Sequence, residues 1–442
     1  MVVTASRIDL GRGAALGALS RTILAAGAAR ALIGCNAPEP PPSTGGTDVV
    51  AGPCGRGAVV VSSDYQSTNV SLVSWDGAVL SASIVSSGSR SSSPGLASPL
   101  SGDVVVPTTP VRGERLALLD RSASVLTWID VRSGEPAGQL ALATAFRANP
   151  QDYVEVSPGK AYVTRHEPNL DPDAAPIDGG SDVLVVDPGA RAIVGRIDLA
   201  PALAGEDPAF YPRPGRAVLV GDSLYVLLTA TSLDFVASAE SRLVEIDARS
   251  DAIRAVTVLE GLHGCGGLAA SAGGSRLAVV CPGTFGGDAT SNAGEAGLVV
   301  LARRDGGLVE EARWTAAELG AGTPGFSVAF ASEDRLVFST LGRDALSEGG
   351  PVDDTLTAVE LAGSAPERGE PEVLLRSKEL PFSLGEVRCA EACGRCLVAD
   401  AETEGGVVHR FDVGADGRAL EHAGAFHVDP RVGLPPRYLG AF

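Results

Sequence analysis

The chain is poor in the residues on which several common functions depend. Its 442 residues include one Met and five His, and aromatic residues make up only 5%. Lys occurs only at Lys160 and Lys378, and the net charge is −19. A protein that binds a nucleic acid duplex or an anionic membrane surface needs a basic face, which this balance opposes. We therefore expect no nucleic acid partner.

Long apolar runs and common catalytic motifs are also missing. Beyond the N-terminal segment no 18 consecutive residues are apolar, so the body of the chain is not expected to span a membrane. There is neither a Gly-x-Ser-x-Gly elbow nor a phosphate-binding loop. His409, His422 and His427 fall in or after predicted outer strands, which leaves too few histidines for a multi-copper or haem site.

The chain is rich in turn residues and in short apolar runs. The 55 Gly and 29 Pro punctuate runs rich in Val, Leu and Ile, and 45% of the chain is apolar. This pattern predicts an all-β protein with an ample core.

The runs form a repeat. Seven segments each end an apolar strand in an acidic or turn residue, and their ends lie 52 to 60 residues apart. They cover residues 70–76, 125–130, 183–187, 243–247, 298–302, 356–360 and 407–412. Seven units of this length predict a seven-bladed β-propeller of four-stranded antiparallel blades over residues 57–442. A two-sheet sandwich is the alternative, and seven regular copies argue against it.

A partner strand precedes most of these segments. Residues 160–164, 223–227, 276–280 and 335–339 are such strands, and each follows a turn. The strand–turn–strand pattern resembles the YVTN-type propeller repeats of surface-layer and lactonase-like proteins. That resemblance implies architecture rather than a particular activity.

The ends of the propeller predict how the ring closes. Residues 58–62 read as a second strand with no first strand before them, and the chain ends in an extended segment, residues 435–442. We expect this segment to supply the missing inner strand of blade 1, which leaves no free edge.

The N-terminus reads as an export signal. Arginines precede a short apolar stretch, residues 23–29, and then Leu-Ile-Gly-Cys at 32–35. This resembles a bacterial lipoprotein signal and implies a signal peptide at 1–34, acylation of Cys35 and a Pro/Gly-rich tether at 35–56. The resemblance implies that the protein belongs to the bacterial cell envelope. It would be an outer-membrane lipoprotein, or a periplasmic or cell-surface protein. A cleaved soluble signal and a misassigned start are the alternatives.

Six further cysteines are expected to form disulfides in an exported protein. Predicted hairpin turns set Cys265 opposite Cys281 and Cys389 opposite Cys396. The remaining pair, Cys54 and Cys393, would lie on one face at the junction of blades 7 and 1. A Cys-x3-Cys-x2-Cys metal site is the alternative, but it lacks further ligands at standard spacing.

The long loops between second and third strands are where we expect a ligand site. The candidate binding residues of this face are Tyr65, Arg147, Asp152, Tyr153, Arg165, His166, Tyr211, Arg213, His263, Arg343 and Asp344. His166 and Glu167 are the candidate proton-transfer pair, although neighbours on a strand point to opposite faces.

The loop after Arg165 is also a candidate calcium site. Asp171, Asp173, Asp178 and Asp182 offer the hard oxygen ligands that Ca²⁺ takes, on a Gly-bearing loop. A solvated acidic loop is the alternative. No other cofactor is indicated.

Three functions follow from these features. The first is an envelope-anchored protein without identified catalytic activity, which binds an unknown protein or small ligand on its loop-rich face and contacts the membrane through its lipid only. The second is a lactonase-like hydrolase or isomerase at the propeller mouth, and the third is a calcium-dependent surface or adhesion module.

Overall fold

The computed structural model describes residues 45–89, 99–171, 173–284, 293–320, 322–342, 352–361, 369–377, 382–401 and 405–442. The predicted signal peptide, Cys35, Arg343 and Asp344 lie outside these residues. Within these ranges, no helix combines the length and the apolar character needed to cross a membrane.

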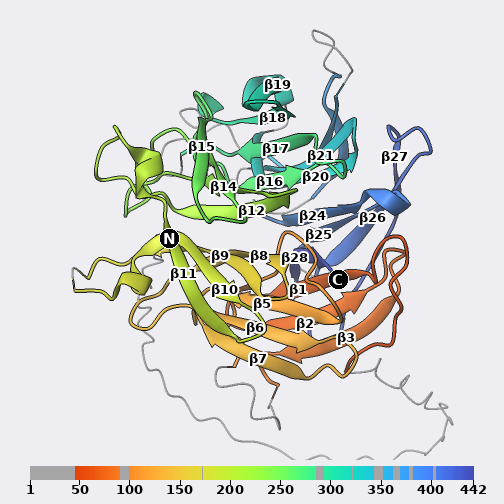
Figure 1. The fold of residues 1–442 in the computed structure, drawn as a ribbon. Coiled ribbons are helices and arrows are strands. Elements are labelled where there is room, and N and C mark those ends of the chain that lie inside the picture. Colours follow the sequence, from red (N-terminus) through yellow and green to blue (C-terminus); the bar gives the residue numbers. More distant parts are fainter. Residues whose placement is uncertain are drawn as a thin grey trace, which may run out of the picture. The chain divides into compact units, whose positions relative to one another are not determined.

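The described residues form seven four-stranded antiparallel sheets around a common centre, which confirms the predicted seven-bladed propeller (Figure 1). Blade 1 contains β28 (Pro436–Ala441), β1 (Ala58–Ser63), β2 (Thr68–Val73) and β3 (Val79–Ser86). Blade 2 contains β4 (Val104–Val105), β5 (Arg115–Asp120), β6 (Val125–Asp130) and β7 (Pro136–Ala141). Blade 3 contains β8 (Pro150–Ser157), β9 (Lys160–Pro168), β10 (Gly180–Asp187) and β11 (Ala192–Asp198).

The remaining blades follow the same order. Blade 4 contains β12 (Pro214–Val220), β13 (Ser223–Leu228), β14 (Arg242–Asp247) and β15 (Ile253–Val258). Blade 5 contains β16 (Gly267–Ala270), β17 (Arg276–Cys281), β18 (Gly297–Arg304) and β19 (Gly307–Thr315). Blade 6 contains β20 (Thr323–Ser332), β21 (Arg335–Leu341), β22 (Thr355–Glu360) and β23 (Glu372–Arg376). Blade 7 contains β24 (Leu384–Ala390), β25 (Arg395–Asp400), β26 (Val407–Val413) and β27 (Leu420–Phe426).

Helical turns in the described part of the chain are short and lie in the connections. They are η1 (Pro176–Asp178), η2 (Ala200–Leu203), α2 (Ala316–Leu319) and η3 (Glu391–Cys393).

The core lies between neighbouring blades. Every residue of β1, β2 and β13 is buried, because a middle strand packs against another blade on each face. One apolar cluster joins Val154 and Val183 of blade 3 to Leu224 and Val244 of blade 4. This two-sided burial is why the middle strands read as continuous apolar runs, whereas β27 at the rim is mostly exposed.

The ring closes as the sequence predicts. The C-terminal strand β28 pairs antiparallel with β1, with Val60 opposite Leu439 and Ala58 opposite Ala441. Its other side approaches β24 so closely that a Cβ on Gly385 would lie 2.3 Å from the Arg437 carbonyl oxygen. Residue 385 must therefore be glycine if β28 is to occupy this place in the ring.

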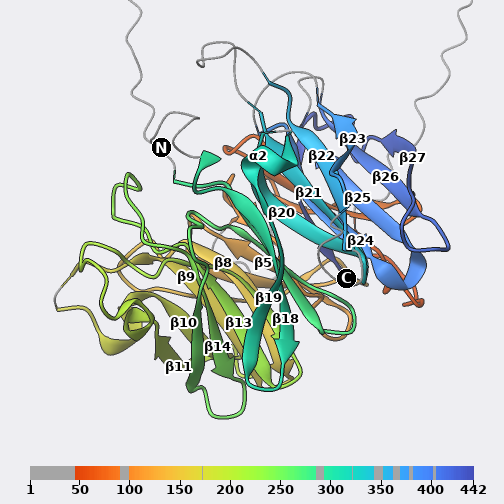
Figure 2. The same ribbon diagram turned by 90° about the horizontal axis from the view of Figure 1, so that it is seen from above.

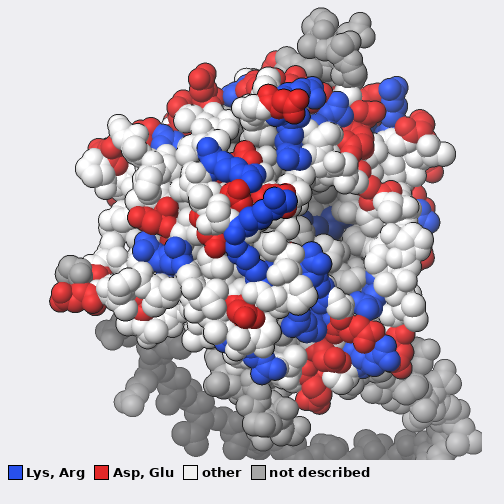
Figure 3. Space-filling view, in the orientation of Figure 1, with Lys and Arg blue, Asp and Glu red and all other residues white. Residues whose placement is uncertain are grey.

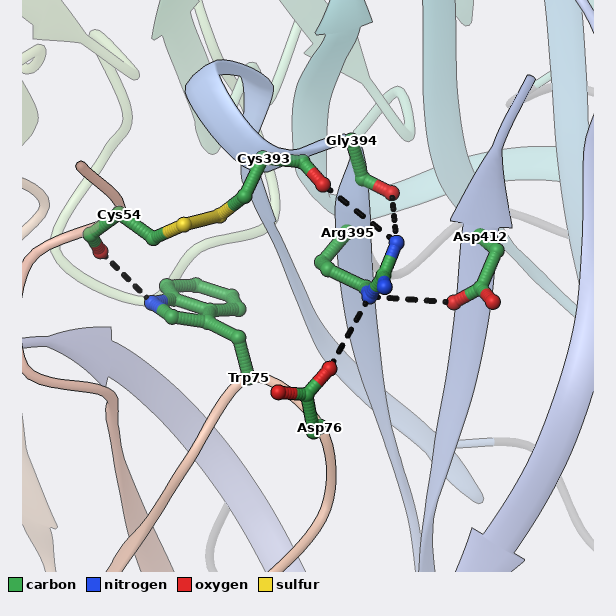
Figure 4. Close-up of a disulfide and its surroundings, with 7 residues drawn as sticks. All are labelled: Cys54, Trp75, Asp76, Cys393, Gly394, Arg395 and Asp412. Carbon is green, nitrogen blue, oxygen red and sulfur yellow. Dashed lines mark hydrogen bonds and ion pairs between the residues drawn. A yellow bond between two sulfur atoms is a disulfide. The ribbon is translucent and has the colours of Figure 1, made fainter. Parts of the chain in front are cut away.

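A disulfide links blades 7 and 1, where the ring closes; we call this junction the seam (Figure 4). Cys54 and Cys393 are bonded across 339 residues of sequence. The indole of Trp75 donates a hydrogen bond to the Cys54 carbonyl oxygen at 2.8 Å, and the Arg395 guanidinium lies 3.3 Å from the Asp76 carboxylate. The pairs Cys265–Cys281 and Cys389–Cys396 are also present, so all three predicted disulfides form.

The propeller has two faces, one at each end of its strands. Figure 2 shows the turns from β14 to β15 and from β18 to β19 on one side, which we call the hairpin face. The connections from β1 to β2, from β9 to β10 and from β13 to β14 lie at the opposite ends of their strands, on what we call the loop face.

Candidate functional site

The loop face opens into a cavity of about 380 Å³ at the mouth of the central channel. Inner strands and loops of all seven blades contribute to its wall, so it exists only when the ring is closed. Among the residues predicted for this face, Tyr65 and His166 line the cavity.

One side of the cavity is basic. Arg121 pairs with Asp103 and donates a hydrogen bond to the Tyr438 hydroxyl at 2.7 Å. Arg216 pairs with Glu386, the acidic residue of the lining. Both guanidinium groups are thereby held in place by neighbouring carboxylates.

Arg437 differs from these two arginines. Its Nε donates to the Ser63 carbonyl oxygen at 2.9 Å and its guanidinium lies 4.7 Å from the Tyr65 ring centroid. Within the described ranges no carboxylate forms an ion pair with it. Asp64 is near enough to act on it electrostatically, but its carboxylate accepts hydrogen bonds from the backbone N–H groups of Gln66 and Ser67. Arg437 therefore lines the cavity as a guanidinium that has no ion pair among the described residues.

Tyr438 adds a neutral donor next to it. Burial raises the pKa of Tyr438 to about 12, so its hydroxyl keeps its proton at neutral pH. Because that oxygen already accepts a bond from Arg121, its proton is available to an acceptor in the cavity.

The rim is aromatic and strained. Tyr65, Phe326 and Phe382 line the cavity, yet 55%, 42% and 49% of their surfaces are exposed. Tyr65 and Phe382 have φ of 65° and 70°, in the left-handed region that bulky side chains rarely adopt. Such backbone strain is concentrated at ligand sites, where it fixes the position of a side chain.

His166 lies beside this rim. Its ring is stacked on Phe235 with centroids 6.2 Å apart, and its buried Nδ1 has no hydrogen bond within the described ranges. Burial, followed by the charge of Arg213, lowers the pKa of His166 to about 4, so the imidazole is neutral at physiological pH. Glu167 does not hydrogen-bond to it but pairs with Arg213 at 2.8 Å.

Other predicted residues of this face lie inside the protein. Asp152 is fully buried and accepts hydrogen bonds from the Thr108 and Ala217 backbones. Tyr153 is buried against Trp128 and donates to Glu155 at 2.6 Å. Arg165 is buried in an ion pair with Asp182. These side chains hold blades together and do not reach the cavity.

The remaining candidates lie away from the cavity. Arg147 is exposed and donates to the Ser122 hydroxyl at 2.9 Å. Tyr211 is held by a backbone hydrogen bond to Thr231, and the His263 ring bonds to the Ser238 hydroxyl. Arg213 is buried beneath Phe235, 4.0 Å from its ring centroid.

The four candidate calcium ligands do not converge in this structure. Asp182 is taken by Arg165 and Arg196, and Asp178 accepts hydrogen bonds from Thr144. Asp171 and Asp173 are exposed. The described residues contain no cluster of three or more His, Cys, Asp or Glu placed to hold a metal ion. A calcium site in this loop stays a prediction.

Solved structures resemble the propeller. It matches a putative 6-phosphogluconolactonase from Bacteroides fragilis with a TM-score of 0.54 and 12% identity, over 86% of this chain and 96% of the other. A putative 6-phosphogluconolactonase from Bacteroides uniformis matches with a TM-score of 0.55 and 12% identity, over 86% of this chain and 98% of the other. At this identity the likeness shows the fold alone. No family model and no curated protein matches the sequence.

Several residues that line the cavity were not predicted from the sequence: Arg437, Tyr438, Phe382, Phe326, Arg121, Arg216 and Glu386. The sequence does contain a signal for Arg437 and Tyr438. A C-terminal segment that forms an inner strand must begin on the loop face, and these two residues are at its start. Phe382 carries no such signal, because its place at the mouth depends on its loop conformation.

Proposed function

We propose that the protein binds a small anionic ligand in the loop-face cavity. The observation that supports this most directly is Arg437, which faces the cavity without an ion-pair partner in the described part of the chain. A buried or half-buried cation of this kind is stabilised when an anion pairs with it. The Tyr438 hydroxyl supplies a second polar contact beside it.

The aromatic rim restricts the chemical class of the ligand further. Phe326 and Phe382 offer apolar faces, and carbon-bound hydrogens of a ring or chain pack against such faces. We therefore infer a ligand with an anionic group and an apolar face, small enough for about 380 Å³. The two similar structures, both of putative 6-phosphogluconolactonases, suggest 6-phosphogluconate as a first probe.

Isothermal titration with 6-phosphogluconate, gluconate and uncharged glucose tests the proposal. The two anions are expected to bind and glucose is not. Arg437→Met is expected to weaken anion binding about 10- to 100-fold, since a hydrogen bond to a charged group contributes ~1.5–3 kcal/mol. Arg431→Met is the matched control, because Arg431 is exposed and pairs with Asp429 outside the cavity. Equal affinities of both variants would contradict the site.

A second candidate function is lactone hydrolysis, which His166 favours. A neutral imidazole at the cavity wall can take a proton from a water that attacks a lactone carbonyl, while the ring C–O bond breaks and its oxygen is protonated. With a pKa of about 4, this base loses activity as the pH falls through 4. Hydrolysis of a lactone panel above buffer, abolished by His166→Ala, would support an enzyme. No turnover would remove this function.

We also propose that the protein is exported and anchored by a lipid on Cys35. Three disulfides support an oxidising compartment, since they are rare in reducing cytosol. In a bacterial host, Cys35→Ser is expected to move the protein from the membrane fraction to the soluble fraction. An unchanged distribution on fractionation would show that the anchor is elsewhere or absent.

A further inference from the structure

A second cavity, of about 500 Å³, lies on the hairpin face. Figure 1 views the propeller from this side, and the space-filling view in the same orientation shows a hollow with basic side chains in and around it (Figure 3). Most of its wall is apolar and made of small residues, including Ala270, Ala329 and Ala390, with Phe330 and Trp75 among the larger ones. Small side chains leave room in the channel that larger ones would fill.

Arg388 is the charged residue at the inner end of this cavity. On β24, Glu386 lines the loop-face cavity, Arg388 lines the hairpin-face cavity, and Ala390 and Glu391 follow towards the hairpin turn. Residues two apart on a strand share a face, so Glu386, Arg388 and Ala390 follow one another along the channel. Of the β24 residues that line the hairpin-face cavity, Arg388 is therefore the one nearest the loop-face cavity.

The charge on Arg388 is only partly compensated. Its Nε donates to the Leu439 carbonyl oxygen at 2.8 Å, and Nη2 lies 3.3 Å from the Glu386 carboxylate. Nη1 has no hydrogen-bond partner among the described residues. Glu386 is also the ion-pair partner of Arg216, so two guanidinium groups share one carboxylate. Asp152 acts on Arg388 at longer range, but backbone N–H groups and the Thr108 hydroxyl occupy its oxygens.

We propose that the hairpin-face cavity binds an amphipathic carboxylate of the fatty-acid type. The carboxylate pairs with Arg388, and the hydrocarbon lies along the alanine-lined wall. This orientation satisfies Nη1 and buries apolar surface on both sides. It also keeps the ligand's charge away from Glu391, which stands nearer the opening. The site is separate from the loop-face cavity and does not depend on the function proposed there.

Dodecanoate below its micelle concentration is the probe, and Trp75 provides the signal because it lines the cavity. Trp128 and Trp314 are buried in the cores of other blades. We expect a saturable change in tryptophan fluorescence that disappears in Trp75→Phe while binding by calorimetry persists. Arg388→Met is expected to weaken dodecanoate binding about 10- to 100-fold, with little effect on uncharged dodecanol.

Ala329→Phe keeps Arg388 and fills the cavity, so it is expected to abolish binding of both probes. It serves as the second variant if Arg388→Met fails to fold, and thermal melting checks both. Arg437→Met, in the other cavity, is expected to bind dodecanoate like wild type. Absence of dodecanoate binding to wild type, or unchanged binding to Ala329→Phe, would overturn the proposal. Equal weakening of dodecanoate and dodecanol by Arg388→Met would overturn the carboxylate contact.

Discussion

Replacement of Arg165 by methionine is expected to lower the free energy of unfolding by about 3–5 kcal/mol, the usual effect of removing one partner of a buried ion pair. Arg165 has no exposed side-chain surface and donates two hydrogen bonds to Asp182, at 2.8 and 2.7 Å. Its remaining N–H groups reach the carbonyl oxygens of Leu142 and Ile177. Methionine fills a similar volume but removes the donor to Asp182 Oδ1 and to the Leu142 and Ile177 carbonyl oxygens, and leaves Asp182 with Arg196 as its remaining ion-pair partner.

Urea denaturation measures the effect as a shift in midpoint at constant slope. Arg249→Met is the control, since Arg249 and Asp222 form an exposed pair whose loss should change stability by less than ~1 kcal/mol. A loss of less than ~1 kcal/mol for Arg165→Met would show that Arg196, the other partner of Asp182, compensates the carboxylate alone.

Removal of the Cys54–Cys393 disulfide is the second change for which we expect a large loss of stability. The double variant Cys54→Ser/Cys393→Ser is expected to be about 2–4 kcal/mol less stable than wild type without reductant. The bridge joins residues 339 apart, so it restricts the unfolded chain far more than a short loop does. It also holds the segment before β1 against blade 7, next to the blade in which β28 pairs with β1.

Cys389→Ser/Cys396→Ser provides the comparison, because that bridge spans only 7 residues. A smaller loss of stability is expected from it, as read from denaturation midpoints in the same buffer. If the two double variants are equally stable, the seam bridge does not act by restraining the unfolded chain.

The architecture was largely predictable because local sequence patterns, repeated in each blade, determine it. Each blade needs an apolar run, a turn and a second run, and the unpaired run at residues 58–62 implied the closing strand that β28 provides. The Cys389–Cys396 disulfide followed for the same reason, because a hairpin turn fixes which residues stand opposite. The Cys54–Cys393 bridge was predicted differently, as the pair that remained.

The candidate site was predictable only in part. Tyr65 and His166 reach the cavity as predicted, Tyr65 from the loop between β1 and β2 and His166 from the end of β9 rather than from a loop. Arg165 and Asp152 looked like mouth residues because they are polar and flank loops, but each has partners from distant sequence that make burial favourable. Such pairing is a property of the closed ring, and so is the position of Arg437 against Tyr65.

The most direct test of the account is a crystal structure of the protein with 6-phosphogluconate. We predict density for an anionic group in contact with the Arg437 guanidinium and the Tyr438 hydroxyl, with the rest of the ligand against Phe326 or Phe382. Ligand bound elsewhere, with the loop-face cavity filled only by water, would contradict the proposed function.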